Sequence, residues 1–306
     1  MFAGHALLAA GIAGLLARHL GASRQRALRA AGVAGAFGMA PDIDIIHAAV
    51  GLSAAGSLAE APEAFWRTST VLHRGVTHSL VIGAGAAAVA WSARVKPVVG
   101  VGLSLAILGV VATTAGPVAM LITGAFLGVV VAIATVAGRM GTPPETVGGA
   151  ALVGLLTHPF GDLFTGTPPA LLFPFEVTII DARVAPAADP TLNLLLAFGV
   201  ELAVLWFGLL ALARVAGVSL RRRVGGRAAL GAALGSAAFV LTPPTMAAAW
   251  HFVFPAIAVG GVGLFPVTDV KRTSRDRGPA LLGAVVTGLA AVTLGVLSYT
   301  AVYLLM

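Results

Sequence analysis

The chain has 306 residues, of which 58% are hydrophobic and only 10% are charged. Soluble globular domains carry about 25% charged residues, so this composition excludes an ordinary soluble domain and predicts a membrane protein. The formal net charge is +7 and there is no cysteine, which excludes disulfides and thiolate metal sites. In a membrane protein we interpret the positive charge as a bias of the cytoplasmic loops, without a need for nucleic acid.

Apolar runs recur along the chain, and a helix needs about 20 such residues to cross a bilayer. In the first half they cover about residues 2–17, 30–40, 80–93, 98–115, 118–137 and 147–156, with Gly116-Pro117 dividing two of them. The last third adds runs at about 192–213, 228–246, 247–267 and 279–304. The runs lack the period-2 alternation of membrane strands. The sequence therefore predicts an all-α, polytopic transmembrane bundle with about ten membrane helices.

The basic residues predict an orientation. They gather in five connecting segments, at residues 18–29, 94–97, 138–145, 214–227 and 268–278. With strict alternation of ten crossings, all five fall on one side, which the positive-inside rule makes the cytoplasmic side. Segments 41–79 and 157–190 then lie together on the other side. We expect a multi-pass protein of the inner or plasma membrane.

Three polar motifs interrupt the apolar sequence on the predicted non-cytoplasmic side. They are Pro41-Asp42-Ile43-Asp44, His73-Arg74-Gly75-Val76-Thr77-His78-Ser79 and Thr157-His158-Pro159-Phe160-Gly161-Asp162. The i, i+4 spacing of His158 and Asp162 predicts that they share a helical face. Asp42 and Asp44 can face the same way in an extended or turn segment. The spacing of His73 and His78 predicts a junction between a loop and a helix.

These motifs together predict a metal site. Five of the seven histidines fall on the same predicted side, beside three acids. Imidazole with carboxylate suits zinc, iron, manganese or nickel. The number of candidate ligands exceeds what one tetrahedral ion needs, which favours a two-metal site. Arg74 is placed to neutralise an anionic substrate oxygen, and Thr77 and Ser79 to hydrogen-bond the ligands.

Each residue taken alone has a simpler interpretation. Asp42 and Asp44 can cap a helix, and a single membrane histidine such as His251 most often packs or bonds to a neighbouring helix. His19 lies beside arginines at a predicted helix end, where it would be solvated. Two other functions stay open for the combined cluster. A metal-ion or proton transporter would line a route through the bilayer with these groups, and a non-catalytic scaffold would need metal only to fold.

The motifs also resemble a known family. His5, the three motifs, Thr165-Gly166 and Leu172-Phe173-Pro174 resemble the YdjM-like membrane-bound, predicted metal-dependent hydrolases, over about residues 1–175. That family is distantly similar to zinc-dependent phospholipase C and P1-type nucleases. The resemblance implies a helical fold and a multinuclear zinc site that cleaves phosphodiesters.

From the residues and the resemblance together we expect an integral membrane hydrolase of a phosphoester, either a phospholipid or a lipid-linked phosphate. Its partners would be membrane lipids and an anionic or lipid-linked small substrate. The cofactor would be a divalent metal, with zinc ahead of manganese and iron. The expected ligands are His5, Asp42, Asp44, His73, His78, His158 and Asp162, and the expected catalytic groups are Arg74, Asp44 and His78. We expect a hydrolase-like membrane domain at 1–190 and an additional four-helix transmembrane region at 191–306.

Overall fold

The computed structural model describes residues 2–48, 52–53, 55–72, 74–265 and 277–306, and these are the residues to which the description below applies. They form helices and connecting segments, and none of them is in a strand, which confirms the all-α prediction. The chain divides into two compact units. The first consists of Met1–Val184 and Val204–Ala216, and the second of Ala185–Ala203 and Gly217–Met306.

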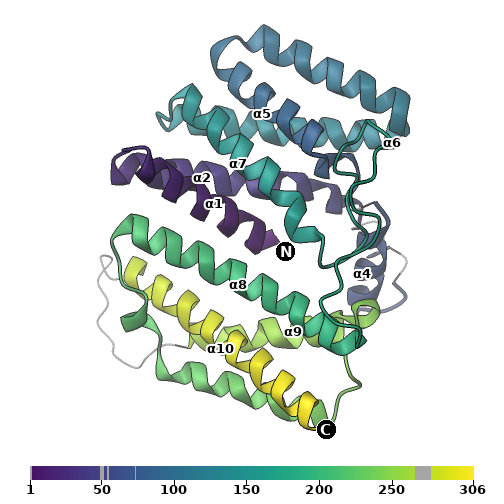
Figure 1. Cartoon of the computed structure of the whole chain (residues 1–306), viewed down its shortest axis with the longest axis vertical. Coiled ribbons are helices and arrows are strands. Elements are labelled where there is room, and N and C mark those ends of the chain that lie inside the picture. The colour runs from purple at the N-terminus through teal and green to yellow at the C-terminus, as the bar shows by residue number, and fades with distance from the viewer. Residues whose placement is uncertain (1, 49–51, 54, 73, 266–276) are drawn as a thin grey trace. The chain divides into compact units, whose positions relative to one another are not determined.

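The first unit contains six α-helices and the end of a seventh among the described residues. Its elements are α1 (Phe2–His19), α2 (Arg24–Met39), the 3-10 segment η1 (Ala40–His47), α4 (Ala61–Leu72), the 3-10 turn η2 (Val76–His78), α5 (Leu80–Val95), α6 (Pro97–Arg139) and α7 (Pro144–Asp162). Figure 1 shows α1, α2 and α7 next to one another, with α5 and α6 beyond them. Helix α8 (Pro190–Ala216) begins in the second unit and ends in the first.

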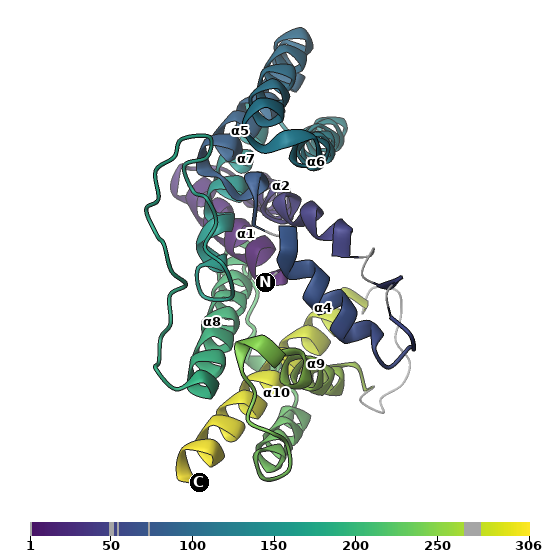
Figure 2. The ribbon, with the colours of Figure 1, turned by 90° about the vertical axis from the view of Figure 1, so that its right-hand side faces the viewer.

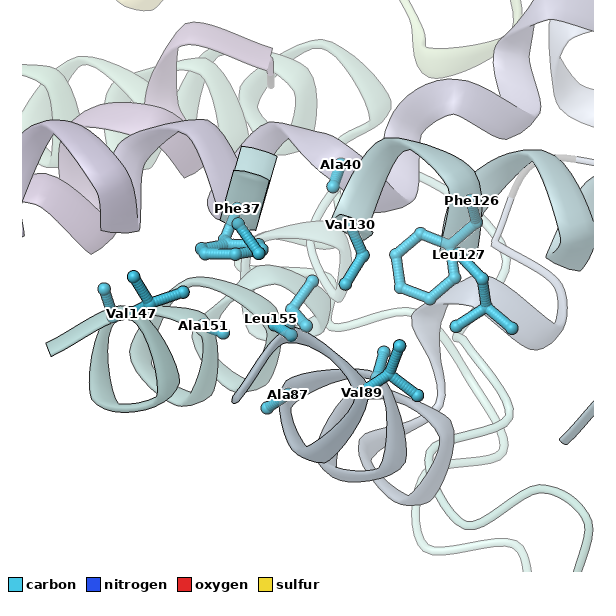
Figure 3. Close-up of a cluster of buried hydrophobic side chains, with 14 of the residues drawn as sticks. Phe37, Ala40, Ala87, Val89, Phe126, Leu127, Val130, Val147, Ala151 and Leu155 are labelled. Atoms are coloured by element: carbon cyan, nitrogen blue, oxygen red, sulfur yellow. The ribbon is translucent and has the colours of Figure 1, made fainter. Parts of the chain in front are cut away.

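The core of the first unit lies between α2, α5, α6 and α7 (Figure 3). Phe37, Val89 and Phe126 are fully buried there, with Leu155 from α7 beside them. Burying a side chain of this size contributes about 1.5–3 kcal/mol. This core holds the helices whose ends carry the polar motifs.

Helix α6 reverses its direction halfway. Gly116 has a φ of 85°, which a glycine adopts without steric cost. The side chain of Leu108 lies 3.8 Å from where a Cβ on Gly124 would be, so the two halves pack against each other. The division that the sequence predicted at Gly116-Pro117 is therefore present as a helical hairpin.

Two glycines bring α1, α2 and α7 into backbone contact. A Cβ on Gly38 of α2 would lie 2.8 Å from the carbonyl oxygen of His5 in α1. A Cβ on Gly154 of α7 would lie 2.6 Å from the carbonyl oxygen of Ala34 in α2. Real Cβ atoms do not approach this closely, because the overlap is strongly repulsive. The close approach places the polar ends of the three helices side by side.

The second unit is built around α10 (Arg277–Leu305). Its other elements are η3 (Arg221–Arg223), η4 (Gly226–Phe239), η5 (Met246–Ala248), α9 (Trp250–Val259) and η6 (Gly260–Leu264). Helix α10 packs most extensively on η4 and η6. The rings of Phe252 and Tyr299 lie edge to face at 4.8 Å, and both are buried. Figure 2 shows α9 next to α10.

The number of membrane helices corrects the sequence prediction. In the described part of the chain, three helices are long and apolar enough to cross a membrane, at Pro97–Arg139, Pro190–Ala216 and Ala280–Leu305. Shorter apolar helices lie at Leu80–Val95 and Trp250–Leu264. The prediction of about ten crossings is wrong because several apolar runs are broken up. The run at 228–246, for example, forms a 3-10 segment and then irregular backbone. The predicted orientation depended on that count and stays a prediction.

Candidate metal centre

The polar motifs converge at one end of the helices of the first unit. His5 lies near the start of α1, Asp42 and Asp44 follow α2 in η1, His78 precedes α5, and His158 and Asp162 lie in the last turns of α7. In Figure 1 the start of α1 and the ends of α2 and α7 lie at the same end of this unit. All six side chains are buried, with at most 5% of their surface exposed. Polar groups buried at this density need charged or hydrogen-bonding partners.

Local sequence explains why these ends carry ordered side chains. Pro41 lacks a backbone N–H and follows the end of α2, where the chain continues as a 3-10 segment that holds Asp42 and Asp44. Ser79 caps α5, because its Oγ accepts hydrogen bonds from the N–H groups of Val81 and Ile82. The same Oγ donates to the carbonyl of Phe173 at 2.7 Å. Ser79 thus anchors the chain next to His78, and these hydrogen bonds join its Oγ to backbone groups and not to a candidate ligand as predicted.

The first group of candidate ligands consists of Asp42, His78 and His158. The Nε2 atoms of the two histidines lie 2.9 Å apart. Asp42 Oδ1 lies 3.5 Å from the Nε2 of His158 and 3.8 Å from that of His78. Tetrahedral ligands at about 2.1 Å from a zinc ion lie about 3.4 Å from one another. The three atoms are therefore spaced as ligands of one ion.

The second group consists of His5, His158 and Asp162. Asp162 Oδ1 lies 3.5 Å from His5 Nε2, and its Oδ2 lies 3.7 Å from His158 Nε2. The latter contact confirms the shared helical face predicted for the i, i+4 pair. Asp162 Oδ2 also lies 3.2 Å from His78 Nε2. Because both groups use His158 and Asp162 reaches His78, the five side chains form one continuous cluster.

The other ring nitrogens of His78 and His158 are held by protein groups. His158 Nδ1 lies 2.7 Å from the carbonyl oxygen of Gly38, which only accepts, so this nitrogen carries the proton. His78 Nδ1 lies 3.0 Å from the Oγ1 of Thr77, which itself donates to Asp44 at 2.9 Å. With a proton on each Nδ1, both Nε2 lone pairs point into the cluster. Metal-ligating histidines are oriented in this way by the partners of their second nitrogen.

Asp44 therefore lies on the far side of the His78 ring from Asp42. Its Oδ2 is 3.3 Å from His78 Nδ1, and neither candidate ligand group includes it. Burial raises the pKa of Asp42, but the adjacent imidazoles of His158 and His78 outweigh this and hold that pKa below its usual value. Burial lowers the pKa of His78, but Asp162, Asp42 and Asp44 together raise it above its usual value. Without metal, the cluster thus favours ionised carboxylates around a protonated His78.

Arg74 borders the cluster. Its Nε lies 3.4 Å from Asp162 Oδ1, and its Nη2 donates to Thr165 Oγ1 at 2.7 Å. Its backbone N–H donates to Asp44 Oδ2, and its φ of 72° is uncommon for a residue with a side chain. A Cβ on Gly166 would collide with the guanidinium. The chain thus positions this cation with several independent contacts, and 13% of its side chain is exposed.

The structure thus brings together six of the seven predicted ligands, and Arg74 with them. The seventh, His73, lies outside the described residues. His19 is exposed at the other end of α1, as its simpler interpretation expected, and His251 is exposed in the second unit, where its ring contacts that of Trp250. The roles of the Gly38 carbonyl and of Gly154 could not be predicted from the sequence. Only their small size hinted at a close approach of helices.

Comparisons with known proteins give one match. A family model described as YdjM inner membrane protein matches residues 1–224. Neither the curated proteins nor the solved structures contain a match to the chain. The match covers the whole candidate metal centre and all of α8. A similarity to phospholipase C or P1 nuclease is not among the matches.

Proposed function

The chain belongs to the YdjM inner membrane protein family, and on that premise we propose that it is a membrane-embedded, metal-dependent hydrolase of phosphoesters. One observation carries the proposal. The Nε2 atoms of His78 and His158 converge with a carboxylate of Asp42 at the spacing of metal ligands, directly beside a positioned arginine. This arrangement provides ligands for a divalent metal ion. It also provides the positive charge of Arg74 for an anionic substrate.

The donor set fits zinc, with manganese or iron as alternatives, because it combines imidazole nitrogen with carboxylate oxygen. His5, Asp42, His78, His158 and Asp162 would hold the metal. A divalent ion bound there would polarise a phosphoryl oxygen and make a water more acidic. Asp44 and Thr77 act through His78, since they hold its Nδ1 and aim its Nε2. We assign Asp44 this positioning role in preference to a role as ligand.

The proposed task of Arg74 is to bind the phosphate of the substrate. Its guanidinium has several N–H donors in a planar fork that matches phosphate geometry. Thr165 and Asp162 hold it next to the ligands. The charge that develops on the phosphoryl oxygens would meet a fixed cation without a reorganisation cost. A phospholipid or a lipid-linked phosphate would bring such a group to a membrane enzyme.

Transport of a metal ion or proton is the alternative that the same residues raise. A transport route would need polar groups at successive depths along the helices. The described ligands instead come from one end of α1, α2, α5 and α7. This distribution supports a single site over a route.

Metal content and hydrolysis of the purified full-length protein test the proposal together. Elemental analysis and cleavage of bis-p-nitrophenyl phosphate and of a fluorescent phospholipid are measured for three variants. His78→Ala should lose both metal and activity. Arg74→Gln should keep the metal and lose at least about 100-fold in activity, as expected when a donor to the reacting oxygens is removed. His251→Ala, an exposed histidine in the second unit, is the control and should keep both.

Two outcomes would contradict the proposal. Full metal occupancy in the His78→Ala protein would remove His78 from the ligands. A metal-loaded wild-type protein that cleaves neither probe but carries the metal into liposomes would favour transport.

A further inference from the structure

A pocket of the first unit lies at the end of α1 away from the metal centre. Leu15, Arg18 and His19 of α1 line it together with Arg214 and Val215 of α8. Its volume is about 450 Å³. Small-molecule sites commonly occupy about 300–1,000 Å³, so the pocket has room for a polar headgroup.

Close helix packing creates this pocket. A Cβ on Gly11 would lie 3.1 Å from the Cβ of Ala211, and one on Gly14 would lie 3.4 Å from Val215 Cγ2. Small residues let the backbones of α1 and α8 approach each other, as they do between membrane helices generally. Both helices end on the same side of the view in Figure 1. The basic residues of their last turns therefore meet at one place.

No described acidic residue neutralises the charge around this pocket. Neither residues 1–41 nor residues 202–268 contain an aspartate or glutamate. Within the described residues, no acid forms an ion pair with Arg18 or Arg214. A single cation at a helix C-terminus can be explained by the helix dipole, and Arg18 does donate to the carbonyl of Ala22. The two arginines around one concavity repel each other and favour a bound anion, to which the ring of His19 can offer a hydrogen bond.

We propose that this pocket binds the phosphate of an anionic phosphodiester, in the form of an anionic phospholipid headgroup. Arg214 lies in the last turn of α8, which is long and apolar enough to cross a membrane, and headgroups lie where such helices end. The arginines match phosphate oxygens, while Leu15 and Val215 provide an apolar floor for the glycerol and acyl carbons. This inference holds whether or not the metal centre is catalytic.

Lipid binding to the full-length protein in neutral detergent tests the proposal. Retention of phosphatidylglycerol, phosphatidylcholine and inorganic phosphate is compared by native mass spectrometry and titration. We expect phosphatidylglycerol to bind at least about 10-fold more tightly than phosphatidylcholine, and Arg18→Gln/Arg214→Gln to weaken its binding about 30-fold. Arg18→Lys/Arg214→Lys keeps the charge and should retain most of the binding. Arg214→Gln alone is a milder second test, with an expected loss of about 5-fold.

Arg24→Gln/Arg26→Gln is the matched control, because it removes the same charge from exposed residues of α2 that do not line the pocket. This control should change the affinity for phosphatidylglycerol by less than about 2-fold. An equal loss in both double variants, or equal binding of the two lipids, would overturn the proposal. Inorganic phosphate that binds as tightly as phosphatidylglycerol, with the same dependence on Arg18 and Arg214, would keep the anion site but make free phosphate its ligand. Unchanged metal content would show that the variants are folded.

Discussion

At one end of α1, His5 is buried among carboxylates and imidazoles, whereas at the other end Arg18 and His19 are exposed and have no acidic partner among the described residues. The two ends belong to one helix and one unit, yet the polar groups are buried at one end and exposed at the other. Buried charge must be compensated within the protein, and it is compensated here by a network whose members fix one another. Exposed charge is compensated by solvent, by ions or by a ligand. Changes at the buried end should therefore be costly in structure and in metal binding, and changes at the exposed end should cost little stability.

The largest effect is expected for His158→Ala. His158 belongs to both candidate ligand groups and contacts Gly38 of α2, so its loss should remove metal binding altogether. The affinity should fall by more than the 10–100-fold that loss of a ligand's supporting partner costs. Metal titration of the purified protein measures it, with His19→Ala as the control at the opposite end of α1. An ion that still binds with wild-type affinity would remove His158 from the ligands of both groups.

Thr77→Val should weaken metal binding without abolishing it. The substitution keeps the volume but removes the hydroxyl that links His78 Nδ1 to Asp44. The ring of His78 then loses part of its orientation, and we expect an affinity loss of about 10–100-fold. Competition against a chelator of known affinity measures it. An unchanged affinity would mean that Asp44 alone suffices to orient the ring.

Gly154→Ala should destabilise the first unit by about 1–3 kcal/mol, because its new methyl group would overlap the backbone of α2. Gly149→Ala on the exposed face of the same helix is the matched control, since nothing lies within 4 Å of its Cβ position. It should stabilise the helix by about 0.5–1 kcal/mol. Unfolding in mixed detergent compares the two. Equal changes in the free energy of unfolding for the two variants would show that α2 and α7 are not in backbone contact.

The smallest effect on stability is expected for Arg18→Gln. The side chain is exposed and its one hydrogen bond lies at the surface, so the free energy of unfolding should change by less than about 0.5 kcal/mol. The same unfolding assay measures it in the absence of lipid. A loss of several kcal/mol would erase the contrast between the two ends of α1.

Local sequence was a good guide to the helical class and to the polar motifs, and a poor guide to the number of membrane crossings. Hydropathy reports how apolar a run is, but it does not report whether the run forms one continuous helix. The runs at 98–115 and 118–137 meet at Gly116 in a hairpin, as their division predicted, whereas the run at 228–246 became a 3-10 segment and irregular backbone. The ligand roles of the six described candidates stay predictions, although their side chains lie together.

The sequence by itself determined the family, the all-helical class and the residues from which a metal site can be built, because these depend on composition and on motifs a few residues long. Only the tertiary structure separated Asp42, which faces the Nε2 atoms, from Asp44, which faces the Nδ1 of His78. It also brought Arg18 next to Arg214. Both outcomes depend on contacts between helices that approach at small residues, and such contacts join positions far apart in the chain.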